Sequence, residues 1–324
     1  MMKKTVRKGK GMAEKYSIHD LRTDDEEIVR GVNWQRKNKV EYALHFNKKA
    51  ERAIKKIQKN PHSIKKLIED KDVFDFMVGV LMYSQKSLYY VPRKEIIRQI
   101  KMNLKPEKFS ERRHLSHLKT FYMMSAGESN GGRMRNLIGK KGNELLCRYI
   151  VDGFDEKEVD YSMKKVKGNI QEIETDDLII LFNKKPKFIN KSIDFIILKK
   201  DSDGEYDIED PKSYISAGEL KSGIDPSGAD EHWKTATTAL SRIREGFKNI
   251  GEVPPDLYFV GGAISNHMAQ EIIEAIEVGD IQGAANLNKE GQVKKLVSDF
   301  LERKQDIKPS TNVKKKKRSA IKRG

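Results

Sequence analysis

One acidic residue inside an apolar run constrains this chain more than any other feature of its sequence. The run is Ile193–Leu198, with Asp194 as its second residue. A short apolar run between polar residues is typical of a β-strand. An ionised carboxylate in such a run is costly unless it is paired or bound to a metal. The run therefore predicts a strand and a partner for the side chain of Asp194.

A second predicted strand, Tyr214–Lys221, offers that partner. Residues two apart on a strand point to the same face, so Glu219 and Lys221 share a face and Leu220 lies opposite. If the two strands are neighbours, Asp194 and Glu219 can hold one hard cation, with the carbonyl of Leu220 as a third ligand. Mg²⁺ takes oxygen ligands and keeps several waters. We therefore expect a magnesium site here.

Such a set of residues predicts hydrolysis of a phosphodiester. The metal would polarise the phosphate and lower the pKa of its water. Lys221 would orient that water and stabilise negative charge in the transition state. Taken alone, a pattern of one acid followed later by Glu-x-Lys is weak in a chain with 48 acidic and 64 basic residues. It also fits an ion pair at an exposed strand end, so the longer sequence must decide.

The pattern of apolar residues changes near Gly168, from helical spacing before it to short apolar runs after it. Residues 16–125 have helical character, with amphipathic segments such as Ala50–Lys59 and Lys94–Leu104. The glycine-rich stretch Gly127–Gly132 predicts a break, and a helix is expected after it over Met134–Val151.

After Gly168, short apolar runs alternate with helical patterns. Two early strands close in sequence predict a hairpin, and a strand–helix–strand unit predicts a right-handed parallel crossover. The fold class is therefore α/β, a mixed sheet flanked by helices. The expected strands are Leu178–Phe182, Ile193–Leu198, Tyr214–Lys221 and Leu257–Val260, and the expected helices are Ala229–Phe247, His267–Val278 and Gln292–Lys304.

The net charge of +16 lies mostly in the two ends of the chain. Residues 1–15 carry a net +5 and residues 301–324 a net +8, which leaves +3 for the body. Basic tails add phosphate affinity that weakens with salt but do not by themselves read sequence. The N-terminal residues have no apolar core of a secretory signal, and no stretch approaches the roughly 18 apolar residues of a membrane span. We expect a soluble, cytoplasmic protein.

The block Gly218–Ala236, which reads GELKSGIDPSGADEHWKTA, closely resembles the signature of the AvaI/BsoBI family of type II restriction endonucleases. That family belongs to the PD-(D/E)XK nuclease superfamily. The likeness continues through Thr238–Arg244 and includes Ser192-Ile193-Asp194 as the site of the first acid. A second block, Gly127–Asn136 with the sequence GESNGGRMRN, also resembles this family.

The resemblance implies a PD-(D/E)XK restriction-endonuclease-like core at 126–304, behind a helical region at 16–125. The tails at 1–15 and 305–324 are additions that we expect to be disordered. The implied activity is magnesium-dependent hydrolysis of both strands of duplex DNA at a short palindrome, typically C-pyrimidine-C-G-purine-G, leaving 5′-phosphates. The implied partners are a second copy of the chain around the duplex and a cognate DNA methyltransferase in the same bacterial host.

The resemblance also adds site residues. His232, near the start of a helix, is a candidate general base or phosphate contact; the alternative is a histidine packed against Trp233. Asp225 can accept a hydrogen bond from a cytosine amino group, or it can cap the turn before Pro226. The remaining candidate DNA contacts are Arg133, Arg135, Asn136, Ser222 and Lys234.

Two other functions stay open at this point. One is a nuclease of repair or recombination that recognises DNA structure rather than sequence. The other is a non-catalytic DNA-binding protein that relies on its basic tails, against which the presence of Asp194, Glu219 and Lys221 argues.

Overall fold

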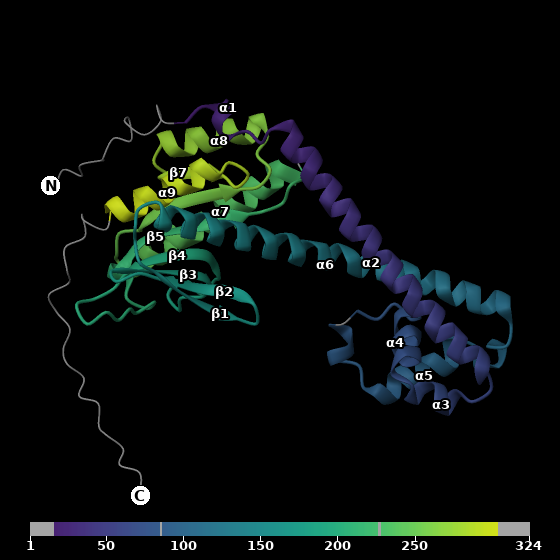
Figure 1. Ribbon diagram of the computed structural model, residues 1–324. Coiled ribbons are helices and arrows are strands. Elements are labelled where there is room, and N and C mark those ends of the chain that lie inside the picture. Colours follow the sequence, from purple (N-terminus) through teal and green to yellow (C-terminus); the bar gives the residue numbers. More distant parts are fainter. Residues whose placement is uncertain (1–15, 85, 226–227, 304–324) are drawn as a thin grey trace, which may run out of the picture. The chain divides into compact units, whose positions relative to one another are not determined.

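A computed structural model describes residues 16–84, 86–225 and 228–303, and it divides the chain into two compact units (Figure 1). One unit holds the residues up to Val29 and those from Ile138 onward, and the other is Arg30–Leu137. The predicted tails at 1–15 and 305–324 lie outside the described residues. No helix in the described ranges is long and apolar enough to cross a membrane.

The first unit is built on a seven-stranded sheet whose strands follow one another in sequence order. Neighbours from β1 to β5 are antiparallel, and β5, β6 and β7 are parallel. The mixed α/β sheet, the β3–β4 hairpin and the parallel β5–β6 crossover confirm the predicted fold class. The strands are β1 (Ser162–Val166), β2 (Asn169–Glu174), β3 (Leu178–Lys184), β4 (Ile193–Lys199), β5 (Tyr214–Lys221), β6 (Asp256–Gly261) and β7 (Gly283–Asn286).

Three of these strands were not predicted from the sequence, and each lacks the usual signal. All five residues of β1 are exposed, and two of them are lysines. In the adjoining β2, Ile170 and Ile173 are three residues apart with Gln and Glu between them, which is not the period of two that indicates a strand. The four residues of β7 read Gly-Ala-Ala-Asn, without a β-branched or aromatic side chain.

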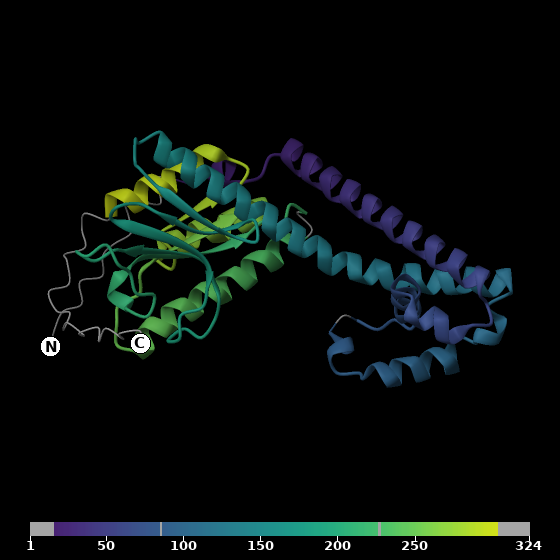
Figure 2. The same ribbon diagram turned by 60° about the horizontal axis from the view of Figure 1, so that its bottom comes forward.

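Helices cover both faces of the sheet (Figure 2). One face packs against α7 (Ala229–Asn249) and α8 (Asn266–Glu277), and the short α1 (Ile18–Leu21) joins that layer. The other face packs against α9 (Glu290–Arg303) and the last turns of α6 (Arg112–Asp155). Successive side chains alternate between the two cores, as the pleat of a strand requires.

The predicted break at Gly127–Gly132 is wrong, because α6 runs through it without interruption. Glycine costs about 1 kcal/mol relative to alanine inside a helix. Burial of Ala126 and Met134 on either side offsets that cost, since these residues anchor the helix before and after the glycines. The amide of Asn130 also donates to the carbonyl of Lys39 in α2 (Asp25–Lys59). Tertiary packing here overrides local propensity.

The Arg30–Leu137 unit is helical, as predicted, and has its own apolar core. That core includes Phe76, Met77, Ile100 and Phe109, all almost fully buried. Pro92 is the N-cap of α5, where the absence of a backbone N–H costs no helical hydrogen bond. The elements between α2 and α6 are α3 (Ile64–Glu69), α4 (Lys71–Val80), η3 (Ser87–Tyr89), α5 (Arg93–Asn103) and η4 (Pro106–Lys108).

Candidate active site

The two predicted acids meet where the pairing of β4 with β5 ends. The last paired residues are Phe195 and Gly218. Beyond them, a carboxylate oxygen of Asp194 accepts the backbone N–H of Leu220 at 2.8 Å, so a side chain continues the ladder. Gly218 permits this close approach, because a Cβ there would lie 2.1 Å from the ring of Phe195. The neighbouring strands that the sequence argument required are therefore present.

Glu219 and Lys221 lie on one face of β5, as the strand period predicts. Glu219 is buried, and the ammonium of Lys221 donates a hydrogen bond to its Oε1. Burial raises the pKa of Glu219 to about 7, and the negative charge of Asp194 adds to that shift. Burial likewise raises the pKa of Asp194. Two carboxylates thus face one another in a site where ionising both is unfavourable.

This arrangement suits a hard cation. A bound divalent ion would neutralise the negative charge of Asp194, which adds to the effect of burial in raising the pKa of Glu219. Across the described ranges, no group of three or more His, Cys, Asp or Glu side chains gathers in a way that could hold a metal. Two carboxylates would supply only part of the oxygen ligands that a hard cation such as Mg²⁺ takes, and the remaining ligands of such an ion are commonly waters.

His232 lies in the first turn of α7, with its ring against the loop that follows Lys221. A Cβ on Gly223 would lie 2.2 Å from Cε1 of the His232 ring, so the glycine allows the imidazole to rest on the loop. Trp233 points elsewhere, into the core against Phe259 with ring centroids 5.2 Å apart. Burial lowers the pKa of His232, and the charge of Lys221 lowers it further, so the imidazole is neutral near pH 7.

The imidazole also has an unused hydrogen-bonding atom. Its Nδ1 is buried and has no hydrogen-bond partner among the described residues. A buried polar atom without a partner is unusual and costly. His232 therefore has one ring nitrogen available for a group that the described part of the chain does not provide.

A buried polar network holds the end of β5 in place. The carbonyl of Lys221 accepts the N–H of Gly262 at 2.7 Å, and the carbonyl of Gly262 accepts the hydroxyl of Thr23. The same hydroxyl accepts the N–H of Ile264 at 2.9 Å and the side-chain amide of Asn286 at 2.8 Å. Thr23 and Asn286 are fully buried, so these bonds are not exchanged with water.

Sequence reasoning missed this network. Thr23 lies 239 residues from Gly262 in the chain, and nothing local to Thr23 marks it. A buried Asn next to a short apolar pair, as in Ala285-Asn286, is the one signal that could have been noticed, since a polar side chain at such a place needs partners.

Ser222 is held from another direction. Its hydroxyl donates to the carbonyl of Ile138 in α6 at 3.2 Å. Gly142, one turn further along α6, allows the contact, because a Cβ there would lie 2.0 Å from Cβ of Ser222. The backbone of α6 therefore contacts the side chain of Ser222 on the loop after Lys221.

The other predicted DNA contacts are surface residues. Asp225 and Lys234 are exposed, on the loop after β5 and on α7. Arg133, Arg135 and Asn136 are exposed on the part of α6 that belongs to the Arg30–Leu137 unit. The structure thus places Asp194, Glu219 and Lys221 at one strand end, with the ring of His232 against the loop that follows, and Ser222 and Asp225 lie on that same loop.

Comparison with known proteins decides the family. A family model described as restriction endonuclease BsobI matches residues 155–302. The type II restriction enzyme BsoBI of Geobacillus stearothermophilus is 30% identical over 314 residues, which cover 86% of this chain and 93% of that enzyme. The chain belongs to the AvaI/BsoBI family of type II restriction endonucleases. The family predicted from the Gly218–Ala236 block is confirmed.

A second relative supports the same assignment over a shorter stretch. The type II restriction enzyme AvaI, from Nostoc sp. and from Anabaena variabilis, is 31% identical over 202 residues. That match covers 56% of this chain and 64% of AvaI. The region matched by the family model contains the candidate site residues Asp194, Glu219, Lys221 and His232.

Proposed function

We propose that this member of the AvaI/BsoBI family is a magnesium-dependent endonuclease that hydrolyses both strands of duplex DNA at a short palindrome of the C-pyrimidine-C-G-purine-G type. The observation that carries the proposal is the buried pair Asp194 and Glu219 at the ends of adjacent strands, with the ammonium of Lys221 beside them. The pKa values of both carboxylates are raised, and a lysine ammonium lies beside them. Such strongly perturbed groups are characteristic of catalytic and metal-binding sites.

The residues of this chain divide the work. Asp194 and Glu219 would hold Mg²⁺, with the carbonyl of Leu220 as a third ligand, and the ion supplies neutralisation of the phosphate charge and activation of water. Lys221 stabilises the negative charge that develops on the phosphate during attack. His232, neutral near pH 7, accepts a proton from the attacking water or contacts a phosphate. The products are a 3′-hydroxyl and a 5′-phosphate.

Recognition follows from symmetry. A palindrome presents two equivalent half-sites, which suits a homodimer arranged around the duplex. We call the set Asp194, Glu219 and Lys221 the acidic site. We propose that Ser222, Asp225 and Lys234 contact DNA near it. Arg133, Arg135 and Asn136 would contact it from the Arg30–Leu137 unit. A cognate methyltransferase in the same bacterial cytoplasm would protect the host genome.

The test is digestion of a bacterial genome with Mg²⁺, followed by sequencing of the ends. We expect discrete fragments with 5′-phosphates at a single palindrome. Glu219→Gln and Lys221→Ala should abolish cutting without loss of DNA binding. Glu172→Gln is the matched control, because it also removes a buried acid paired with lysines but lies on β2.

Three results would contradict the proposal. Undiminished cutting by the Glu219 and Lys221 variants would remove these residues from catalysis. A smear, or cutting only at junctions, would indicate a nuclease that recognises DNA structure. Tight binding without any cleavage, lost when residues 304–324 are deleted, would indicate a binding protein that relies on its tail.

A further inference from the structure

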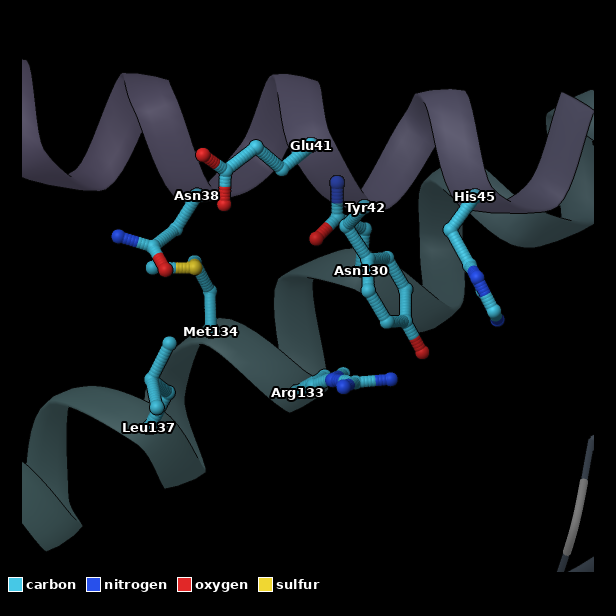
Figure 3. A pocket seen from close by; sticks show the side chains of 8 residues that line it. All are labelled: Asn38, Glu41, Tyr42, His45, Asn130, Arg133, Met134 and Leu137. Atoms are coloured by element: carbon cyan, nitrogen blue, oxygen red, sulfur yellow. The ribbon is translucent and has the colours of Figure 1, made fainter.

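A largely polar cavity lies within the Arg30–Leu137 unit, and side chains of α2 and α6 line it (Figure 3). Its volume is about 240 Å³. Buried Met134 and half-buried Leu137 supply an apolar part of the lining. The rest is polar: Asn38, Glu41, Tyr42 and His45 come from α2, and Asn130 and Arg133 from α6. We call this cavity the α2/α6 slot.

The guanidinium of Arg133 has a fixed place in this slot. Its central carbon lies over the ring of Tyr42, 3.9 Å from the ring centroid, and Figure 3 shows the two side chains in contact. Such a cation–π contact holds the guanidinium at the ring while leaving the N–H groups at its edge available. Within the described part of the chain, Arg133 forms no hydrogen bond or ion pair through those N–H groups.

The supporting ring is itself held from the core. Tyr42 packs edge-to-face on Phe46, with centroids 4.7 Å apart, and Phe46 packs on Tyr122. Tyr122 in turn contacts Phe76 at 5.0 Å, and Phe76 is fully buried. A continuous row of aromatic rings thus connects Arg133 to the core of this unit. The direction of its donor edge is therefore set before any ligand arrives, which lowers the entropic cost of binding.

The donor edge matches two kinds of paired acceptor on DNA. One is a pair of phosphate oxygens, and the other is the N7 and O6 edge of a guanine. The presence of Glu41 in the same slot favours the guanine edge over the phosphate. Its carboxylate repels a phosphate, which offers acceptors only. A carboxylate can instead accept the N4 amino group of cytosine, and a G·C pair presents that amino group beside the guanine acceptors in the major groove.

We propose that the α2/α6 slot reads a G·C base pair from the major groove, with Arg133 on the guanine and Glu41 on the cytosine amino group. Tyr42 is a positioning residue that holds the arginine fork. This inference rests on the proposed function, because it requires a DNA substrate. It adds a specificity-determining site that is separate from the acidic site on β4 and β5.

The experiment measures binding of the full chain, without divalent metal, to the cognate duplex and to duplexes with one base pair exchanged at a time. The wild-type protein should lose about 5- to 150-fold in affinity when the G·C pair that the slot reads is exchanged. Arg133→Ala and Glu41→Ala should each reduce that loss at this one position. Discrimination at the other positions should be unchanged.

Further variants separate positioning and charge from folding. Arg133→Lys keeps the charge but not the planar fork, so it should lose discrimination at the same position while binding the cognate duplex better than Arg133→Ala. Tyr42→Phe keeps the stacked ring and should behave as wild type, whereas Tyr42→Leu should behave as Arg133→Ala. Arg36→Ala is the control, because Arg36 is exposed on α2 and does not line the slot.

The contrary outcomes are distinct. If Arg133→Ala weakens binding equally for every duplex and lowers the salt dependence by about one charge, the slot holds a phosphate and the proposal is wrong. Unchanged affinities would show that the slot does not touch DNA. A wild-type protein that prefers no duplex would refute the proposed function itself, and this is measured before any variant is made.

Discussion

Replacing Glu219 by Gln should make the metal-free protein more stable at about pH 8, and this gain should fade as the pH falls towards 5. The acid is buried beside Asp194, and burial raises its pKa from 4.5 to about 7. Between these two values the folded protein holds a proton that the unfolded chain releases. Stability contributed by this group is therefore lost as the pH rises through the folded-state pKa.

The size of the effect follows from the shift. A difference of about 2.5 between the two pKa values corresponds to about 3 kcal/mol at full ionisation, since one pKa unit is worth 1.36 kcal/mol. Gln cannot ionise, so the Glu219→Gln protein avoids this cost. The difference in unfolding free energy between variant and wild type should thus increase by about 2–3 kcal/mol from about pH 5 to about pH 8.

Urea unfolding in the presence of a chelator measures this difference, with the tryptophan fluorescence as the signal. Glu172→Gln provides a control of opposite sign. Burial acts to raise the pKa of Glu172, but hydrogen bonds from Lys184 and Lys164 outweigh it and leave the pKa below its usual value. Removing that acid should destabilise the protein near neutral pH, and the loss should shrink as the pH falls through the acidic range.

A flat difference between Glu219→Gln and wild type across this pH range would refute the reasoning, because it would mean that Glu219 titrates alike in the folded and unfolded states. Adding Mg²⁺ supplies a second check. The ion should stabilise the wild-type protein at about pH 8, where Glu219 is ionised, and should have much less effect on the variant.

Three further predictions concern other parts of the chain. Thr23→Val should destabilise the protein by about 1–3 kcal/mol in urea unfolding, because buried donors lose their acceptor, and should slow single-turnover cleavage, while Thr23→Ser restores both. Gly142→Ala should destabilise the protein and slow cleavage, because the added methyl group clashes with Ser222. Adding Ser222→Gly to that variant should relieve the clash. Gly139→Ala is the control: nothing lies near its Cβ, so this change should instead stabilise the protein by up to about 1 kcal/mol. Deleting residues 304–324 removes nine basic side chains, so non-specific DNA binding should weaken and depend less on salt while the cleavage site stays the same; an unchanged salt dependence would count against a role for this tail.

The sequence by itself determined which residues could form the acidic site, namely Asp194, Glu219 and Lys221. The apolar run around Asp194 predicted a buried strand, and the period of two placed Glu219 and Lys221 on one face. These are local properties, because the pleat of a strand follows from neighbouring residues alone. The same holds for the helices on either side of the sheet, whose apolar spacing is visible in the chain.

Only the tertiary structure decided how these local pieces meet. The contact of Asp194 with the amide of Leu220 depends on the register of β4 against β5 and on the ring of Phe195 lying over Gly218. The hold of Thr23 on the end of β5 joins residues far apart in the chain. The glycines that predicted a break in α6 remain helical, because packing before and after them outweighs a propensity of about 1 kcal/mol per residue. Local patterns determine which face a side chain takes, whereas register and long-range hydrogen bonds arise only when distant segments are packed together.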